Sequence, residues 1–200
     1  NIIFDWSGVL SNDLIPVYTA VMKVFKKLRL KQITLEEFKK EFTIPVINFY
    51  KKYNPNLTKE KTHSLFVKEI HSVGEPKPFP KAKETLKFLK EKGIKMALLS
   101  SHPQEKLEKE IKDYNFQEFF IDVKGSVHDK TETILELMEK NNFKSNETVY
   151  VGDLSHDIHA GKKAKVITIA VSWGYYSKER LSKENPDYLI DGFRKLKEII

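Results

Sequence analysis

The chain of 200 residues contains no cysteine, which excludes disulfide bonds and thiolate metal sites and gives no indication of a secreted protein. It also lacks a long apolar run at its start, because the first apolar residues lead within a few positions into Asp5. That segment is too short for a signal peptide or a membrane-spanning helix. We therefore expect a cytoplasmic protein without a membrane partner. Since the chain begins with Asn1 and not with methionine, we expect a residue or more to precede it.

Arginine is scarce, since 32 of the 35 basic residues are lysine and these are scattered over nearly every expected helix. The net charge of +7 and the pI near 9.2 raise the question of nucleic-acid binding. Recognition of bases and phosphates favours the planar fork of arginine. A lysine coat mixed with 28 acidic residues is more typical of a solubility or thermal adaptation, so we expect no nucleic-acid partner. A positive surface would instead steer anionic substrates inward.

Short apolar runs alternate with amphipathic stretches in the last 120 or so residues. This alternation predicts strands at 94–99, 119–123, 148–151, 166–171 and 188–190, and helices at 81–92, 103–114, 131–141, 155–164 and the carboxyl-terminal end. Together with a first strand at 2–4, the pattern predicts an α/β fold: a Rossmann-like parallel sheet with helices on both faces.

Residues 13–78 show helical periodicity only, with expected helices at 14–28, 34–42, 45–53 and 58–73. We therefore predict an α/β core domain made of residues 1–12 and 79–200, with an inserted all-helical domain at 13–78. The segments 11–13 and 75–80, the second stiffened by three prolines, are expected to act as a pair of hinges.

Polar residues follow three of the predicted strands. Asp5 ends the first strand and precedes a turn at Gly8, and Ser100 follows the second strand. Asp153 follows the strand at 148–151, and Asp157 comes one helical turn later. A buried carboxylate is costly without a cation or hydrogen-bond donors, and ligands bind at the carboxyl ends of parallel strands. Two of these residues also have a simpler interpretation, because Asp5 and Ser100 can cap the turn or helix that follows.

These motifs, in this order and at this spacing, resemble those of the haloacid dehalogenase superfamily of phosphatases and related hydrolases. The four motifs of the superfamily would correspond to Asp5 with its turn, Ser100, Lys130, and Asp153 with Asp157. The resemblance covers the whole chain, and it implies that the helical insert is the cap domain of the family.

The end of the chain also resembles the phosphoglycolate phosphatase-like branch, in the segments 171–175 and 186–190. Trp173, Tyr175 and Tyr176 in or next to the first segment either line the pocket or pack against the adjacent helix. We expect a monomer or a homodimer.

The resemblance implies Mg²⁺-dependent hydrolysis of a small phosphorylated metabolite through an aspartyl-phosphate on Asp5. It implies that the ion is held by the side chains of Asp5 and Asp153 and by the backbone carbonyl of Ser7, and that Asp157 either ligates the ion through water or orients another ligand. It further implies that the phosphoryl group is bound by Lys130, by the Ser100 hydroxyl and by backbone donors of Trp6, Ser7 and Ser101.

The lysine motif departs from the family pattern at one position. The family often has proline after this lysine, whereas Thr131 follows Lys130 here. Lys124 therefore remains a rival for the same role.

Ser7 is the main departure from the family pattern, because most of its phosphatases carry there an aspartate that protonates the leaving oxygen and later activates water. General acid–base help is worth on the order of 10² to 10⁴ in rate. The substrate could have a leaving group that needs no proton, such as an acyl phosphate or anhydride. Alternatively, His102, His128 or His156 donates the proton, or the protein is a catalytically weak, metal-binding relative that senses or scaffolds. Phosphonate hydrolysis and dehalogenation are minor alternatives.

Overall fold

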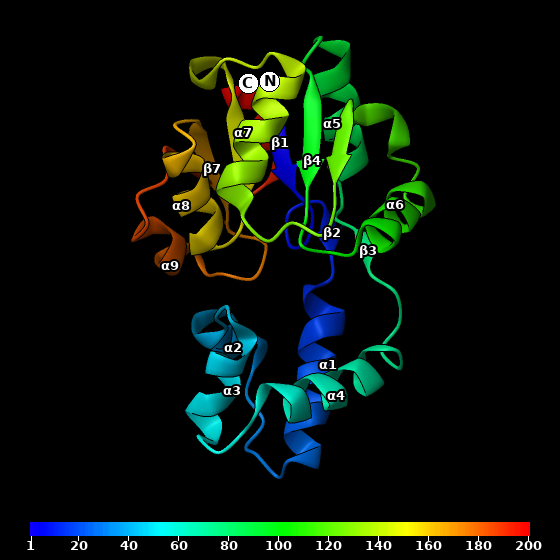
Figure 1. The fold of residues 1–200 in the computed structure, drawn as a ribbon, viewed down its shortest axis with the longest axis vertical. Coiled ribbons are helices and arrows are strands. Elements are labelled where there is room, and N and C mark those ends of the chain that lie inside the picture. Colours follow the sequence, from blue (N-terminus) through cyan, green and yellow to red (C-terminus); the bar gives the residue numbers. More distant parts are fainter. The chain divides into compact units, whose positions relative to one another are not determined.

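The computed structural model describes residues 1–200, which form two compact units (Figure 1). One unit consists of Asn1–Asn12 and Lys77–Ile200 and contains the large sheet. The other consists of Asp13–Pro76 and contains helices only. No helix in either unit has the length and apolar character needed to cross a bilayer.

The first unit is built on a six-stranded sheet with the order β5-β4-β1-β6-β7-β8, in which every neighbouring pair is parallel. The predicted α/β class with a parallel sheet is therefore confirmed. The strands are β1 (Ile2–Asp5), β4 (Met96–Leu99), β5 (Asp122–Lys124), β6 (Val149–Gly152), β7 (Ile167–Val171) and β8 (Tyr188–Ile190).

Helices cover both faces of this sheet, as side-chain alternation along β1 requires. Ile2 and Phe4 join a buried cluster with Leu86 of α5 and Leu107 of α6, whereas Ile3 joins a second cluster that includes residues of α7 and α8. The helices of this unit are α5 (Ala82–Glu91), α6 (Gln104–Asp113), α7 (Lys130–Asn141), α8 (Ser155–Lys163), α9 (Lys178–Ser182) and α10 (Phe193–Ile199), with 3₁₀ turns at Gln117–Phe119 and Ser145–Glu147.

The strand predicted at 119–123 is wrong at its start, because β5 begins only at Asp122. Phe119 instead ends a 3₁₀ turn, where its buried ring meets that of Phe116 edge to face at 5.9 Å. Phe120 likewise meets Phe4 at 6.5 Å. These two positions are apolar because their rings pack against other aromatic rings, and not because they form a strand.

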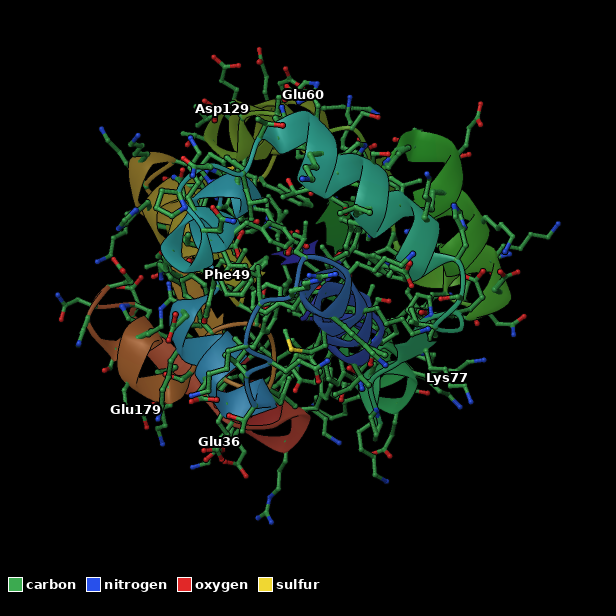
Figure 2. All side chains as sticks on the ribbon, turned by 90° about the horizontal axis from the view of Figure 1, so that it is seen from below. Glu36, Phe49, Glu60, Lys77, Asp129 and Glu179 are labelled. Atoms are coloured by element: carbon green, nitrogen blue, oxygen red, sulfur yellow. The ribbon has the colours of Figure 1, made fainter.

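The helical unit has a core of aromatic rings. Phe49, labelled in Figure 2, is fully buried and lies within 6 Å of the rings of Phe25, Phe38 and Phe42. The helices that carry this core are α1 (Leu14–Lys27), α2 (Leu35–Glu41), α3 (Val46–Tyr53) and α4 (Lys59–Ile70).

Local signals in the sequence account for where these helices begin. The Thr34 and Glu37 side chains form a reciprocal capping box at the start of α2: the Glu37 N–H donates to Thr34 Oγ1 at 3.2 Å, and the Thr34 N–H donates to Glu37 Oε2 at 2.7 Å. Thr58 caps α4 in a similar way, by accepting from the N–H of Lys61 at 3.3 Å.

The two chain segments that leave and re-enter the sheet unit are paired with each other. β2 (Ser11–Asn12) and β3 (Lys77–Pro78) form a short antiparallel ladder, and the Phe79 N–H donates to the Leu10 carbonyl at 2.9 Å. The ladder was not foreseen, because a two-residue strand has no recognisable periodicity.

Candidate active site

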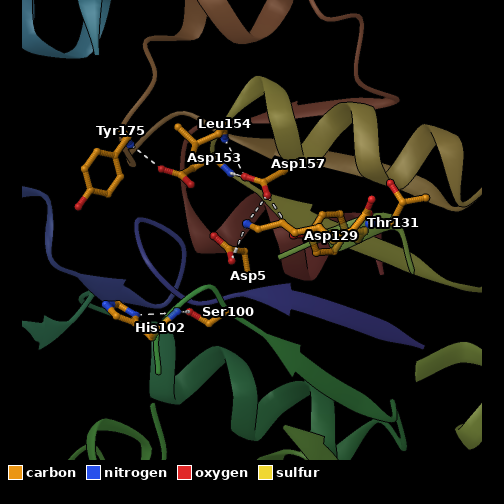
Figure 3. Close-up of polar contacts among 11 residues, drawn as sticks. Asp5, Ser100, His102, Asp129, Thr131, Asp153, Leu154, Asp157 and Tyr175 are labelled. Atoms are coloured by element: carbon orange, nitrogen blue, oxygen red, sulfur yellow. Dashed lines mark hydrogen bonds and ion pairs between the residues drawn. The ribbon is translucent and has the colours of Figure 1, made fainter. Parts of the chain in front are cut away.

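Three buried carboxylates meet at the carboxyl end of the central strands (Figure 3). Asp5 ends β1, Asp153 directly follows the neighbouring β6, and Asp157 lies in the first turn of α8. Their oxygens lie within 4.8 Å of one another, and the residues are only 4%, 0% and 0% exposed. Parallel pairing of β1 with β6 brings these groups together although the sequence separates them by about 150 positions.

Lys130 supplies the positive charge of this cluster. It is the first residue of α7, and its buried Nζ lies 2.9 Å from Asp5 Oδ1 and 2.6 Å from Asp157 Oδ1. Burial on its own would lower the pKa of Lys130, but the charges of Asp157 and Asp5 outweigh it and raise that pKa. The ammonium group therefore stays charged at neutral pH. Lys124, the rival residue, contributes its carbonyl to the Ser100 N–H at 2.8 Å and makes no ion pair with the cluster.

Asp157 is fully satisfied by hydrogen bonds. Its Oδ1 accepts from Lys130 and from the Tyr150 hydroxyl at 3.0 Å, and its Oδ2 accepts from the N–H groups of Asp153 at 3.2 Å and Leu154 at 2.9 Å. Tyr150 was missed in the sequence as a site residue. The available signal was its polar hydroxyl in an otherwise apolar buried strand, since buried hydroxyls need a partner.

Asp153, in contrast, has one free oxygen. Its Oδ2 accepts from the Tyr175 N–H at 2.5 Å, whereas its Oδ1 is buried without any hydrogen-bond partner. Burial raises the pKa of Asp153 well above its usual range, and the neighbouring Asp157 and Asp5 raise it further. Burial also raises the pKa of Asp5 to about 7, although the Lys130 ammonium opposes this shift. Burial is thus the main cause of both shifts.

This donor set fits a hard divalent cation. Carboxylate oxygens are the ligands that Mg²⁺ and similar ions prefer, and a cation would stabilise the ionised form of carboxyl groups whose pKa burial raises. The unpartnered Oδ1 of Asp153 and the nearby Asp5 carboxylate are the oxygens most available to it.

The side chains of Asp153 and Asp157 occupy space that is free only because the neighbouring residues are glycines. A Cβ at Gly8 or Gly174 would collide with the Asp153 carboxylate, and a Cβ at Gly152 would collide with Asp157. Gly8 also has a φ of +72°, which disfavours any other residue. Gly174, which lies far from the acidic motifs in the sequence, was missed as a site residue because no local pattern connects it to Asp153.

At the same edge of the sheet, one histidine lies within hydrogen-bond distance of two serine hydroxyls. His102 Nδ1 lies 3.2 Å from Ser7 Oγ and 3.3 Å from Ser100 Oγ, and the His102 N–H donates to Ser100 Oγ at 3.1 Å. Burial lowers the pKa of His102 to about 4, and the charges of Lys106 and Lys130 lower it further. The imidazole is therefore neutral at physiological pH. Of the three histidines considered as proton donors, it is the one in contact with Ser7, because His128 and His156 are exposed and hydrogen-bond to no site residue.

The remaining candidate residues have other surroundings. The Trp6 indole is buried, donates to Glu110 Oε2 at 2.6 Å and stacks on Tyr114 at 5.3 Å, so only its backbone faces the site. The Trp6 N–H hydrogen-bonds to the Asp5 carboxylate. Ser101 is exposed.

The aromatic residues that follow β7 pack against their own unit. Trp173 donates to the Val9 carbonyl at 3.1 Å, and its ring lies 4.7 Å from that of Phe193. Tyr175 and Tyr176 are buried, and the guanidinium of Arg180 lies 3.3 Å from the Tyr176 ring centre. Of the two interpretations of these aromatics, the contacts favour packing, and the Tyr175 contribution to the site is its N–H group.

Comparison with known proteins gives the same class. Residues 2–171 match the family model described as haloacid dehalogenase-like hydrolase. This chain therefore belongs to the haloacid dehalogenase-like hydrolase family, and the resemblance deduced from its motifs is confirmed.

Named relatives and solved structures agree with this assignment. Pyrophosphatase PpaX of Halalkalibacterium halodurans is 25% identical over 100% of this chain and 95% of its own length. A phosphoglycolate phosphatase of Vibrio parahaemolyticus is 32% identical over 61% of this chain and 56% of its own length. A solved structure of a haloacid dehalogenase-like family protein of Streptococcus pneumoniae, 17% identical, matches the fold with a TM-score of 0.83 over 99% of this chain and 96% of that chain.

Proposed function

We propose that this protein is a Mg²⁺-dependent phosphatase that hydrolyses a small phosphorylated metabolite, with Asp5 as the nucleophile. The observation that carries this proposal is the buried cluster of Asp5, Asp153 and Asp157 on Lys130, with one carboxylate oxygen left unpartnered. The names of the relatives, which include a pyrophosphatase and phosphoglycolate phosphatases, support it. The helical unit at 13–76 would then serve as the cap domain.

In the proposed reaction, an oxygen of Asp5 forms a bond to phosphorus while the bond from phosphorus to the leaving group breaks. Water then attacks the aspartyl-phosphate, releases phosphate and restores the Asp5 carboxylate. The ion would be held by Asp5, Asp153 and the Ser7 carbonyl, and it would offset the repulsion between the carboxylates and the phosphoryl group. Lys130 would neutralise further charge, and the Ser100 hydroxyl would bind a phosphoryl oxygen.

The structure also bears on the leaving group. Ser7 Oγ contacts His102, and burial lowers the pKa of that histidine, so the partner of the side chain at position 7 is a neutral imidazole and not an acid. We therefore propose that the preferred substrates are phosphoanhydrides or acyl phosphates, whose leaving groups depart without a proton. A phosphoglycolate-like alkyl ester would be hydrolysed more slowly, by roughly the 10²-fold or more that general acid catalysis contributes.

Phosphate release from purified full-length protein tests this proposal. The panel should contain pyrophosphate, acetyl phosphate, phosphoglycolate and a phosphonate, each with and without Mg²⁺. We expect turnover of the first two, its loss in EDTA and its loss in Asp5→Asn. Ser7→Asp should raise hydrolysis of the alkyl ester at least about tenfold, since it restores a carboxyl group at the position of the general acid.

The runner-up function is a catalytically weak relative that binds metal and senses or scaffolds, and the absence of a carboxyl group at position 7 favours it. If no substrate is turned over, and if Asp5→Asn changes nothing except metal affinity measured by calorimetry, this second function replaces the phosphatase.

A further inference from the structure

One buried acidic residue of the sheet unit takes no part in the cluster of carboxylates. Glu110 lies on the inward face of α6 together with Leu107 and Ile111, and its side chain is 6% exposed. Its Oε2 accepts from the Trp6 indole N–H at 2.6 Å, whereas its Oε1 has no hydrogen-bond partner and lies 3.7 Å from Lys106 Nζ. A carboxylate in a core is costly, and an apolar residue would fill this position without that cost. The carboxylate therefore points to a role other than stability.

The indole that this carboxylate holds belongs to the turn after the proposed nucleophile, Asp5. The Trp6 carbonyl accepts from the N–H groups of Leu10 at 2.9 Å and Ser11 at 3.0 Å, which closes the turn on itself. On its other side, the Trp6 N–H hydrogen-bonds to the Asp5 carboxylate. A shift of the indole would therefore move the hydrogen bond to Asp5 and the backbone of Ser7 together.

The same helix also contacts the end of this turn. Tyr114 is the C-cap of α6, one helical turn after Glu110, and its hydroxyl lies 2.9 Å from Ser11 Oγ. The Tyr114 ring stacks on the Trp6 indole at 5.3 Å, and Phe116 meets that indole edge to face at 6.2 Å. An indole has a single N–H, so Glu110 accepts the only hydrogen bond that this side chain donates.

We propose that Glu110 is a positioning residue for the phosphatase reaction. By holding the Trp6 indole, it fixes the backbone that presents the Asp5 carboxylate and the Ser7 carbonyl to the phosphoryl group and the ion. This role rests on the function proposed above. Glu110 hydrogen-bonds to none of the clustered carboxylates and acts only through the indole. Such a role affects the rate strongly, because a misplacement of about 1 Å costs up to about 10²-fold.

Steady-state kinetics of full-length variants with acetyl phosphate and Mg²⁺ test this role. Glu110→Leu removes the acceptor and should lower kcat about tenfold or more while KM stays within about threefold, because misplaced groups react slowly although the substrate still binds. Glu110→Gln keeps an acceptor oxygen and should retain kcat within about threefold. Glu108→Leu is the matched control, since Glu108 is exposed on the same helix and accepts from Gln104 of that helix.

Breaking the contact from its other side shows whether Glu110 acts through the indole. Trp6→Phe removes the donor, keeps an aromatic ring and should lower kcat by a similar factor. The double variant Trp6→Phe/Glu110→Leu should be no slower than either single variant, because the contact can be lost only once. The double variant also replaces both polar partners by apolar groups, so it should fold at least as stably as Glu110→Leu.

Amide hydrogen exchange measured by NMR, without substrate or ion, reports on the turn directly. Glu110→Leu should speed exchange of the Leu10 and Ser11 amides, which hold the turn closed, about tenfold or more. The Leu154 amide, which donates to Asp157, is the internal control and should exchange as in wild type. A general loss of stability would instead speed exchange at all three amides.

The proposal is overturned if Glu110→Leu has the kcat of Glu108→Leu, if Glu110→Gln is as slow as Glu110→Leu, or if the effects of the two single variants multiply in the double variant. If no substrate is turned over, the phosphatase proposal fails and hydrogen exchange decides on Glu110. Faster exchange confined to Leu10 and Ser11 then upholds its role in fixing the turn. Unchanged exchange, or exchange that is faster at Leu154 as well, overturns that role.

Discussion

Replacing Lys130 by methionine removes the one positive charge that the structure places among the buried carboxylates. Methionine has a similar length and fits a buried site, so the change isolates the loss of charge and of two hydrogen bonds. The ammonium contacts Asp5 at 2.9 Å and Asp157 at 2.6 Å, and its side chain is 9% exposed. Solvent therefore screens these ion pairs little, unlike the surface pairs of the chain.

The expected loss of stability follows from this burial. Removing one partner of a buried ion pair leaves an uncompensated charge and costs about 3–5 kcal/mol in the free energy of unfolding. Protonation of a carboxylate can relieve part of this cost, and Asp5, whose pKa burial already raises to about 7, is the first to accept a proton. We expect a loss of about 4 kcal/mol at pH 8 and about 3 kcal/mol at pH 6.

The sign of this pH dependence is fixed by the direction of the pKa shift. Without Lys130 the pKa of Asp5 rises further in the folded state, so the folded variant holds more protons than the unfolded chain. A carboxyl group with a raised pKa destabilises the fold increasingly as the pH rises from its unfolded value through its folded value. One additional bound proton changes the free energy of unfolding by up to about 1.4 kcal/mol per pH unit.

Urea unfolding followed by tryptophan fluorescence measures this loss of stability. The signal reports on the unit that contains the sheet, because both tryptophans, Trp6 and Trp173, lie there. The buffer should contain EDTA, so that no divalent ion replaces the lost charge. Lys124→Met is the matched control and should change stability by less than about 0.5 kcal/mol. A Lys130→Met variant within about 1 kcal/mol of wild type at both pH values would refute the electrostatic argument.

Two other substitutions test the packing of the site. Gly174→Ala places a methyl group against the Asp153 carboxylate and should abolish phosphate release. Gly192→Ala is the control and should retain it, because the added methyl group would have no heavy atom within 4 Å. Equal activity of the two variants would contradict the steric argument. Trp6→Phe leaves the buried Glu110 carboxylate without its donor and should lower the free energy of unfolding by about 2 kcal/mol. Chemical denaturation followed by circular dichroism checks this second value, and an unchanged midpoint would count against it.

The convergence of the acidic groups was predictable from the sequence because it needs only one structural rule. Asp5 and Asp153 each follow an apolar strand, and the carboxyl ends of neighbouring parallel strands lie at the same edge of a sheet. The position of Lys130 was inferred from the family resemblance alone. The structure shows how it reaches the carboxylates, as the first residue of a helix whose N-cap is Asp129.

Other parts of the site could not be predicted, because they depend on how distant loops return to the sheet. The period of β6 places Tyr150 on the face opposite to Val149 and Val151, but not beside any particular acceptor. The choice among three histidines depended on the loop after β4, which turns His102 back toward Ser7. No periodic pattern encodes either contact.

The hydrogen bonds divide the three carboxylates into different tasks. Asp157 receives four bonds, two of them from the backbone that carries Asp153, so direct contact with a cation would require it to give one of them up. Asp153 has an oxygen that nothing in the protein satisfies, although it is wholly buried. An unsatisfied buried carboxylate oxygen is costly, so we infer that this oxygen is kept for a ligand. Asp157 instead holds the backbone of Asp153 and the Lys130 side chain in place. The unsatisfied oxygen of Asp153 therefore lowers the stability of the fold. We expect a cation bound to it to stabilise the sheet unit as well as to act in catalysis.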